Sequence, residues 1–122
     1  MKKILIIDDS PFMTQMFGMR LHDEGFETLI AGNGEDGIKI AKNEKPNIIL
    51  LDLAMPGMNG WDVLKKLKKS EQTKEIPVLI LTNSKGNKAD RERAEKLGAA
   101  EFLMKIELKV EDIVKIVKKY IN

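Results

Sequence analysis

Three short and almost purely apolar runs constrain the fold of this chain more than any other feature. They are Ile4–Ile7, Ile48–Leu51 and Val78–Leu81. Each run alternates too little for a strand that is wetted on one face, and strands of parallel sheets that are covered on both faces have this pattern. Weaker strand candidates cover Glu27–Ala31 and Glu101–Lys105. The sequence therefore predicts five strands.

Stretches with helical spacing separate the strand candidates. Apolar side chains recur every three or four residues within Met13–Leu21, Val63–Leu67 and Val110–Ile121, so each stretch carries one apolar stripe. Shorter helices are predicted around Ile38–Ala41 and Ala89–Leu97. Because strand and helix alternate along the whole chain, we expect a flavodoxin-like, doubly wound α/β fold. Its five-stranded parallel sheet would have the order 2-1-3-4-5, with helices on both faces.

The first helix carries two local signals. Ser10 and Pro11 are typical of an N-cap followed by proline at the first helical position. Gly18 lies inside the same helix, where glycine costs about 1 kcal/mol relative to alanine. Close packing is the one reason that the sequence offers for it.

Composition excludes several classes of function. The chain has no cysteine, which removes disulfides, cysteine-ligated metals and thiol nucleophiles. With 21 Lys and Arg against 19 Asp and Glu, the net charge of +2 is too small to indicate nucleic acid. The densest basic cluster, at Lys65, Lys66, Lys68 and Lys69, is interpreted as a solvated helix face, because no aromatic or arginine residue interleaves with it.

The sequence also gives no sign of a membrane partner. No apolar run approaches the roughly 20 residues that a membrane span needs, and no signal peptide follows Lys2 and Lys3. We therefore expect a cytoplasmic domain that binds neither membrane nor nucleic acid.

Polar or charged residues follow four of the predicted strands. Asp8 and Asp9 follow the first, Asp52 the third, Thr82 the fourth and Lys105 ends the fifth. In open α/β sheets ligands bind outside the carboxyl ends of the strands, near the point where strand order reverses. The first and third strands are neighbours about 4.8 Å apart in this order. We therefore expect the three aspartates to meet, with Thr82 and Lys105 on the far side.

Such a cluster has a definite chemistry. Neighbouring carboxylates repel each other unless a proton or a cation relieves the repulsion. Oxygen ligands select a hard cation, and Mg²⁺ fits best because it takes one or two carboxylates together with water and phosphate oxygens. With Lys105 and Thr82 opposite, the pattern indicates phosphoryl transfer. The metal and Lys105 would neutralise phosphoryl oxygens, while Asp52 attacks in line and becomes an acyl phosphate.

Two conspicuous residues are assigned no chemistry. His22 is the only histidine and lies near the end of the first helix, away from every strand end. It is therefore predicted to be a surface residue, and no Ser/His/Asp triad can form around it. Trp61 and the methionines are interpreted as packing residues.

At this point the chain resembles the receiver domains of two-component response regulators, especially the free-standing, CheY-like kind. The resemblance rests on ILIIDDSPFM, AGNGEDGIKIA, PNIILLDLAMPGMNGWDVLKKLK, IPVLILTN and KLGAAEFLMK, which stand in the family's order and spacing. It runs along the whole chain. Residues 1–122 would thus form one receiver domain without an output domain, acting through a partner.

The resemblance implies roles for the acidic residues. Asp52 looks like the phosphoacceptor, which receives a phosphoryl group from a phosphohistidine on a sensor histidine kinase or phosphotransfer protein. Asp9 looks like a direct Mg²⁺ ligand and Asp8 like a partner that acts mainly through water. The backbone carbonyl of Ala54 would be a further ligand.

It also implies a switch. Lys105 would pair with the phosphoryl oxygens, and the Thr82 hydroxyl would move towards them, which alters the face formed by helix four, strand five and helix five. Phe102 stands where the family often has a switching aromatic, although a core aromatic fits this position nearly as well. With no hydroxyl to satisfy, Phe102 should favour burial. The protein would be a monomer or a phosphorylation-dependent dimer.

Three positions bear on how far the family pattern applies. Ile106 replaces the proline that usually follows the lysine; since a non-proline cis bond costs about 3 kcal/mol, we expect a trans link and a differently shaped loop. Asn83 replaces a small residue and would narrow access to the site. Ala54 and Ser84 occupy positions that tune the lifetime of the phosphoryl group.

The interpretation is thus a phosphorylation-driven binding switch with Mg²⁺-dependent self-phosphorylation and self-dephosphorylation, not a conventional turnover enzyme. Two alternatives stay open. One is a receiver-like scaffold that binds partners without phosphate. The other is an aspartyl phosphatase of the haloacid dehalogenase type, whose second aspartate is Ala54 here and whose cap domain is missing.

Overall fold

The computed structural model describes residues 1–82 and 88–121. A parallel sheet of five strands has the order β2-β1-β3-β4-β5, which confirms the predicted α/β topology. The strands are β1 (Lys3–Ile7), β2 (Glu27–Ala31), β3 (Ile48–Asp52), β4 (Val78–Thr82) and β5 (Glu101–Met104). The helices are α1 (Pro11–Asp23), α2 (Gly34–Glu44), α3 (Gly60–Lys69), α4 (Lys88–Lys96) and α5 (Val110–Ile121), with a short 3-10 helix at Lys105–Glu107.

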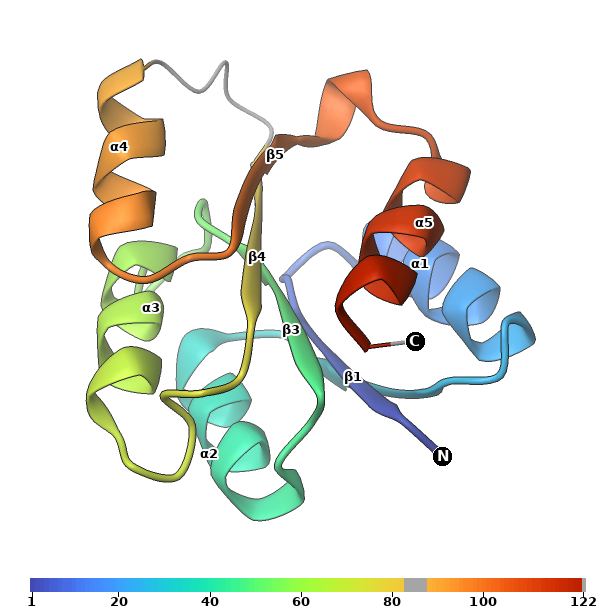
Figure 1. Ribbon diagram of the computed structural model, residues 1–122, viewed down its shortest axis with the longest axis horizontal. Helices are drawn as coiled ribbons and strands as arrows, with labels where there is room; N and C mark the ends of the chain where they lie inside the picture. The colour runs from blue at the N-terminus through green and yellow to red at the C-terminus, as the bar shows by residue number, and fades with distance from the viewer. Residues whose placement is uncertain (83–87, 122) are drawn as a thin grey trace.

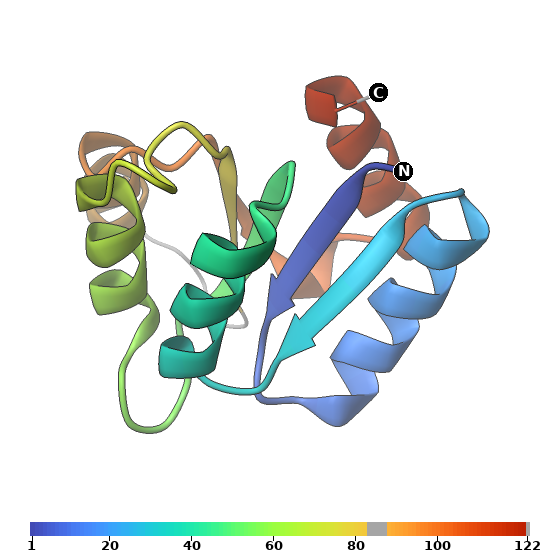
Figure 2. The ribbon, with the colours of Figure 1, turned by 90° about the horizontal axis from the view of Figure 1, so that it is seen from below.

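Helices cover both faces of the sheet, and this explains the continuous apolar runs. Helices α2, α3 and α4 lie on one side, while α1 and α5 lie on the other (Figures 1 and 2). Successive strand residues point to opposite faces. In β1, Leu5 and Ile7 therefore pack in the core beneath α2, α3 and α4, whereas Ile4 and Ile6 pack in the core beneath α1 and α5. A strand with two apolar layers over it has no position left for a polar side chain until it ends.

The first helix begins as predicted. The Ser10 side chain caps α1 by accepting a hydrogen bond from the Met13 N–H at 3.4 Å, and Pro11 is the first helical residue. Its fixed φ and missing N–H suit this position. The capped start places Asp8 and Asp9 in the short turn between β1 and α1.

The end of β5 differs from the prediction, which carried the strand through Lys105. The strand ends at Met104, and the Leu108 N–H donates to the Lys105 carbonyl at 3.2 Å, closing a 3-10 turn. No peptide bond among the described residues is cis, so the expected trans link before Ile106 is confirmed. Asn83 and Ser84 lie outside the described residues, so the expectations for them stay untested.

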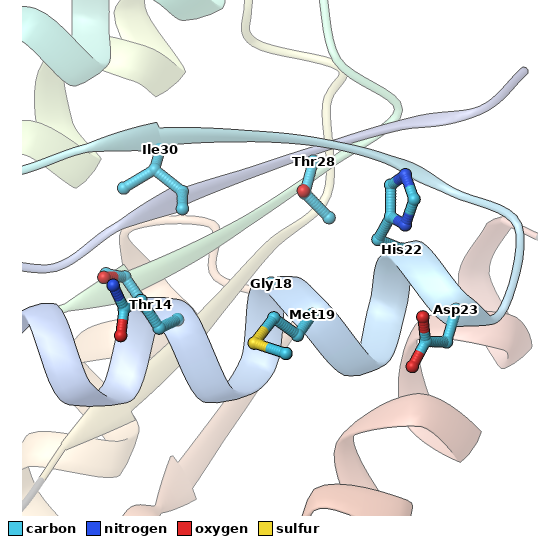
Figure 3. A pocket seen from close by; sticks show the side chains of 8 residues that line it. Thr14, Gly18, Met19, His22, Asp23, Thr28 and Ile30 are labelled. Carbon is cyan, nitrogen blue, oxygen red and sulfur yellow. The ribbon is translucent and has the colours of Figure 1, made fainter.

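Close packing does not explain Gly18, and that prediction was wrong. A Cβ at this position would lie 3.5 Å from the Ile30 Cδ1 and 3.9 Å from the Thr28 Oγ1, which is ordinary van der Waals contact. Gly18 faces an open hollow between α1 and β2 (Figure 3). Gly60 is the opposite case, because a Cβ there would meet the Leu53 backbone Cα at 2.4 Å.

Changing Gly18 to alanine is therefore expected to stabilise the protein by about 1 kcal/mol, since alanine is the better helix former and the space is free. Urea denaturation followed by circular dichroism measures the change. Gly60→Ala is the matched control and should destabilise the fold. A loss of stability in Gly18→Ala would show that the hollow does not accept even one methyl group.

Among the residues described, no helix has both the length and the apolar character needed to cross a membrane.

Candidate functional site

Three aspartates converge at the carboxyl edge of the sheet, as predicted. Asp8, Asp9 and Asp52 each offer a carboxylate oxygen, and these oxygens lie within 4.8 Å of one another. Asp8 and Asp52 are each only 4% exposed, whereas Asp9 is exposed. The cluster thus joins two buried carboxylates to one that faces solvent.

The alternation of side chains along the strands explains which charged groups meet. Asp8 and Asp52 continue the series of residues that faces α1 and α5, and Lys105 does the same beyond β5. The residues two positions before these three all pack with the core on that side: Ile6, Leu50 and Leu103. The three charged side chains therefore leave the sheet toward the same side.

Lys105 lies inside the acidic cluster rather than across from it, which differs from the expectation. Its Nζ is 2.6 Å from the Asp8 Oδ2 and 3.7 Å from the Asp52 Oδ2. The first distance is a charge-assisted hydrogen bond, and the second is too long for one. All three side chains are at most 5% exposed. One lysine thus offsets part of the repulsion between the buried carboxylates.

Local backbone groups hold the other oxygen of each buried carboxylate. The Ser10 N–H donates to the Asp8 Oδ1 at 2.9 Å, and the Ala54 N–H donates to the Asp52 Oδ1 at 3.1 Å. Both bonds join an aspartate to the residue two positions later, which is a common aspartate turn. Each carboxylate is therefore fixed in orientation before any ligand binds.

Asp52 carries an energetic cost in this arrangement. Burial raises the pKa of its carboxyl, and the charges of Asp8 and Asp9 add to the rise. The Lys105 ammonium and the Ala54 N–H lower the pKa and offset only part of it. The ionised Asp52 therefore destabilises the fold at neutral pH, which keeps the group available for a cation or for reaction.

Asp52→Asn should consequently raise the free energy of unfolding at pH 7 in EDTA, by about 1 kcal/mol. A carboxyl with a raised folded pKa opposes folding above that pKa, and the effect disappears as pH falls and both states become protonated. The gain from asparagine should therefore shrink as pH falls. Urea denaturation of both proteins across this range tests it. A gain that is absent at pH 7, or that grows toward acid, contradicts the assignment.

The donor set fits a hard divalent cation. All the side-chain ligands are carboxylate oxygens, they are close enough to share one ion, and Asp9 keeps one side open to water. Mg²⁺ prefers such oxygen sites and retains several of its waters. The acidic cluster thus has the ligand chemistry of a Mg²⁺ site.

The remaining predicted site residues lie on β4 and β5. Thr82 ends β4, is 1% exposed and pairs in register with Met104. Phe102 pairs with Ile80 and is 5% exposed, so its expected burial is confirmed.

Sequence reasoning missed Arg91. Its guanidinium Nη1 donates to the Phe102 carbonyl at 3.1 Å, and its Cζ lies 5.4 Å from the centre of the Phe102 ring. No sequence pattern could have predicted this contact. Helix α4 has one buried residue, Ala94, and the long stem of an arginine lets its guanidinium reach many different partners.

Two residues that were assigned no chemistry lie away from the acidic cluster. His22 is exposed and lines the hollow of about 350 Å³ between α1 and β2, where Figure 3 shows it beside Thr28. Trp61 is partly buried against the core of α2, α3 and α4, with the Arg93 guanidinium 4.2 Å from its ring centre. Both placements agree with surface and packing roles.

Comparison with known proteins defines the class. The sequence model of the protein family described as the response regulator receiver domain matches residues 4–118. The chain therefore belongs to the response regulator receiver domain family, and its acidic cluster and Lys105 stand at the strand ends of that fold.

Particular relatives extend this picture. Protein PilH of Pseudomonas aeruginosa is 39% identical over 105 residues, which cover 86% of each chain. The structure of chemotaxis protein CheY4 of Vibrio cholerae superposes with a TM-score of 0.91 at 28% identity, covering 99% of both chains. A CheY-like receiver domain protein of Methanospirillum hungatei gives 0.89 at 26% identity, covering 98% of this chain and 92% of that one.

Other relatives are longer proteins. The DNA-binding response regulator MtrA of Mycolicibacterium smegmatis is 34% identical over 104 residues, which are 85% of this chain and 44% of MtrA. The chain thus spans less than half of that relative.

Proposed function

We propose that this protein is a phosphorylation-activated switch in a two-component phosphorelay, in which Asp52 accepts a phosphoryl group from a sensor histidine kinase or a phosphotransfer protein. One observation carries the proposal. The Asp52 Oδ1 is held by the Ala54 N–H, while its Oδ2 faces the Lys105 ammonium at 3.7 Å. A carboxylate that is oriented, costly to ionise and next to a cation is prepared to act as a nucleophile.

The transfer step involves one bond made and one bond broken. A carboxylate oxygen of Asp52 attacks phosphorus, and the P–N bond of the donor phosphohistidine breaks with its electron pair left on the imidazole nitrogen. The product is an acyl phosphate on Asp52. Hydrolysis by water returns the carboxylate and inorganic phosphate, which makes the switch reversible.

The acidic cluster would hold Mg²⁺ through Asp8, Asp9 and Asp52, with the Ala54 carbonyl as a further ligand. The ion would supply positive charge against the phosphoryl oxygens. Lys105, whose Nζ is 3.7 Å from the Asp52 Oδ2, would add a second positive charge against the phosphoryl oxygens.

Lys105 and Thr82 would carry the signal outward. A phosphoryl group on Asp52 gives both side chains a new acceptor, so Lys105 shifts from Asp8 toward it and Thr82 follows. Thr82 ends β4 and Lys105 directly follows β5, so the movement would reach the face of α4, β5 and α5. A downstream protein would read that face, and we place this exchange in the cytoplasm, as the family implies.

We further propose that residues 1–122 act as one receiver domain. The family match over residues 4–118 supports this, as does the coverage of 86% of PilH and 99% of CheY4.

The test is phosphorylation with a small donor. Protein with Mg²⁺ and acetyl phosphate is expected to gain the mass of one phosphoryl group, by intact-mass spectrometry, and EDTA should prevent the gain. Asp52→Asn should show no gain, while Asp23→Asn, an exposed aspartate on α1, should behave as the wild type. No modification of the wild type by any donor would favour the phosphate-independent scaffold instead.

A further inference from the structure

An arginine on helix α4 contacts the edge strand of the sheet. Figure 1 shows α4 beside β5, which is the last strand of the sheet. Within Lys88–Lys96 the one buried residue is Ala94. Arg91 stands on the same helix and is exposed, yet its guanidinium reaches back over β5. Arg91 therefore adds a polar contact between α4 and the edge strand to the apolar packing of Ala94.

The arginine makes two contacts with the same residue. Its Nη1 donates to the Phe102 carbonyl at 3.1 Å, and its Cζ lies 5.4 Å from the centre of the Phe102 ring. A charge-assisted hydrogen bond fixes the strand, and a cation–π contact covers the buried ring from outside. Because both contacts join Arg91 to Phe102, a movement of α4 relative to β5 would disturb them.

Phe102 is also connected to the acidic cluster. It precedes Lys105 by three residues along β5 and its 3-10 extension, and Lys105 is bonded to Asp8 at 2.6 Å rather than to Asp52. A phosphoryl group on Asp52 would draw Lys105 away from Asp8. Because strand and turn are continuous, that shift would pull on the end of β5 and would strain the bond from Arg91 to the Phe102 carbonyl.

We propose that Arg91 is a positioning residue that holds α4 and Phe102 in the unphosphorylated arrangement, so that its release is coupled to phosphorylation of Asp52. The inference rests on the proposed function and adds to it the residue that sets the strength of the switch. Coupling is reciprocal. If phosphorylation weakens the contacts of Arg91, removal of those contacts makes phosphorylation more favourable.

The experiment compares three variants with the wild type. Arg91→Met keeps the length of the side chain and removes its charge and donors, while Arg91→Lys keeps the charge without the planar fork. Arg93→Met is the matched control, because Arg93 lies on the same helix but contacts the Trp61 ring at 4.2 Å. Two readouts are used: the initial rate of modification by acetyl phosphate, from intact mass, and half-saturation by beryllium fluoride with Mg²⁺, from ¹⁹F NMR.

Arg91→Met should reach half-saturation at about one-fifth of the beryllium fluoride concentration, and its modification by acetyl phosphate should be faster than that of the wild type. Arg91→Lys should lie between it and the wild type, and Arg93→Met should match the wild type. A purely structural contact would lower the melting temperature and leave both readouts unchanged. Unchanged readouts in Arg91→Met, or equal gains in Arg93→Met, overturn the proposal. If Arg91→Met does not fold, Arg91→Lys decides the question by the same criteria.

The two proposals can fail separately. A wild type that is modified normally, together with variants that match it, refutes the role of Arg91 and leaves the phosphoacceptor role of Asp52 intact. A wild type that neither gains mass nor binds beryllium fluoride refutes the proposed function, and the role of Arg91 falls with it.

Discussion

Replacement of Lys105 by methionine is expected to lower the free energy of unfolding by about 3 kcal/mol in EDTA and to make stability strongly dependent on Mg²⁺. Methionine fills a similar volume but leaves Asp8, which is 2.6 Å from the Lys105 Nζ, without a cation. Asp52 loses its nearest positive charge at the same time. Two buried carboxylates would then face each other, which is costlier than either alone.

Added Mg²⁺ should restore most of the lost stability, because the metal ion can take the place of the missing ammonium beside the carboxylate oxygens of Asp8 and Asp52. Urea denaturation of Lys105→Met in EDTA and in Mg²⁺ measures both effects. The matched control is Lys68→Met. Lys68 is also partly buried, but its Nζ donates to the backbone carbonyls of Lys74 and Ile76 instead of to a carboxylate of the acidic cluster. Its loss should cost stability that Mg²⁺ does not restore, and equal rescue of both variants would contradict the argument.

The second large effect concerns Asp9. Asp9→Asn should weaken Mg²⁺ binding by about tenfold or more while leaving stability in EDTA within about 0.5 kcal/mol of the wild type. Asp9 is the exposed member of the acidic cluster, so it can contribute charge to a bound ion without contributing to the packed core. The effect of Asp9 on Mg²⁺ binding can therefore be measured separately from any effect on the stability of the fold.

Isothermal titration with MgCl₂ measures the first quantity, and urea denaturation in EDTA measures the second. Asp23→Asn removes an exposed aspartate on α1 and should change neither. An affinity for Mg²⁺ that is unaltered in Asp9→Asn would remove Asp9 from the ligand set. A large loss of stability in EDTA would mean that Asp9 supports the fold as well.

Most of the site could be located from sequence because the two cores impose a strict rule on the strands. Since Ile4–Ile7 and Ile48–Leu51 are covered on both faces, a polar residue is tolerated only where each run ends. Asp8 and Asp52 are those residues. The alternation of strands and helices then indicated the strand order, because right-handed crossover connections allow few arrangements of five parallel strands.

The end of β5 shows where such reasoning stops. Its pattern is weak, and the difference of one residue at Lys105 arose from a turn closed by the Leu108 N–H. Gly18 is a second example. Helix propensity identified Gly18 as unusual, but only the positions of Thr28 and Ile30 showed that a methyl group fits beside it in ordinary van der Waals contact.

The sequence by itself determined the order of the elements, the two-layered core and the edge at which the three aspartates meet, because these follow from the period of apolar residues along the chain. Only the tertiary structure decided that Lys105 bonds to Asp8, 97 residues away, and that Arg91 reaches Phe102. The physical reason is that a long charged side chain has many rotamers of similar energy. Its partner is selected by the neighbours that packing brings within reach.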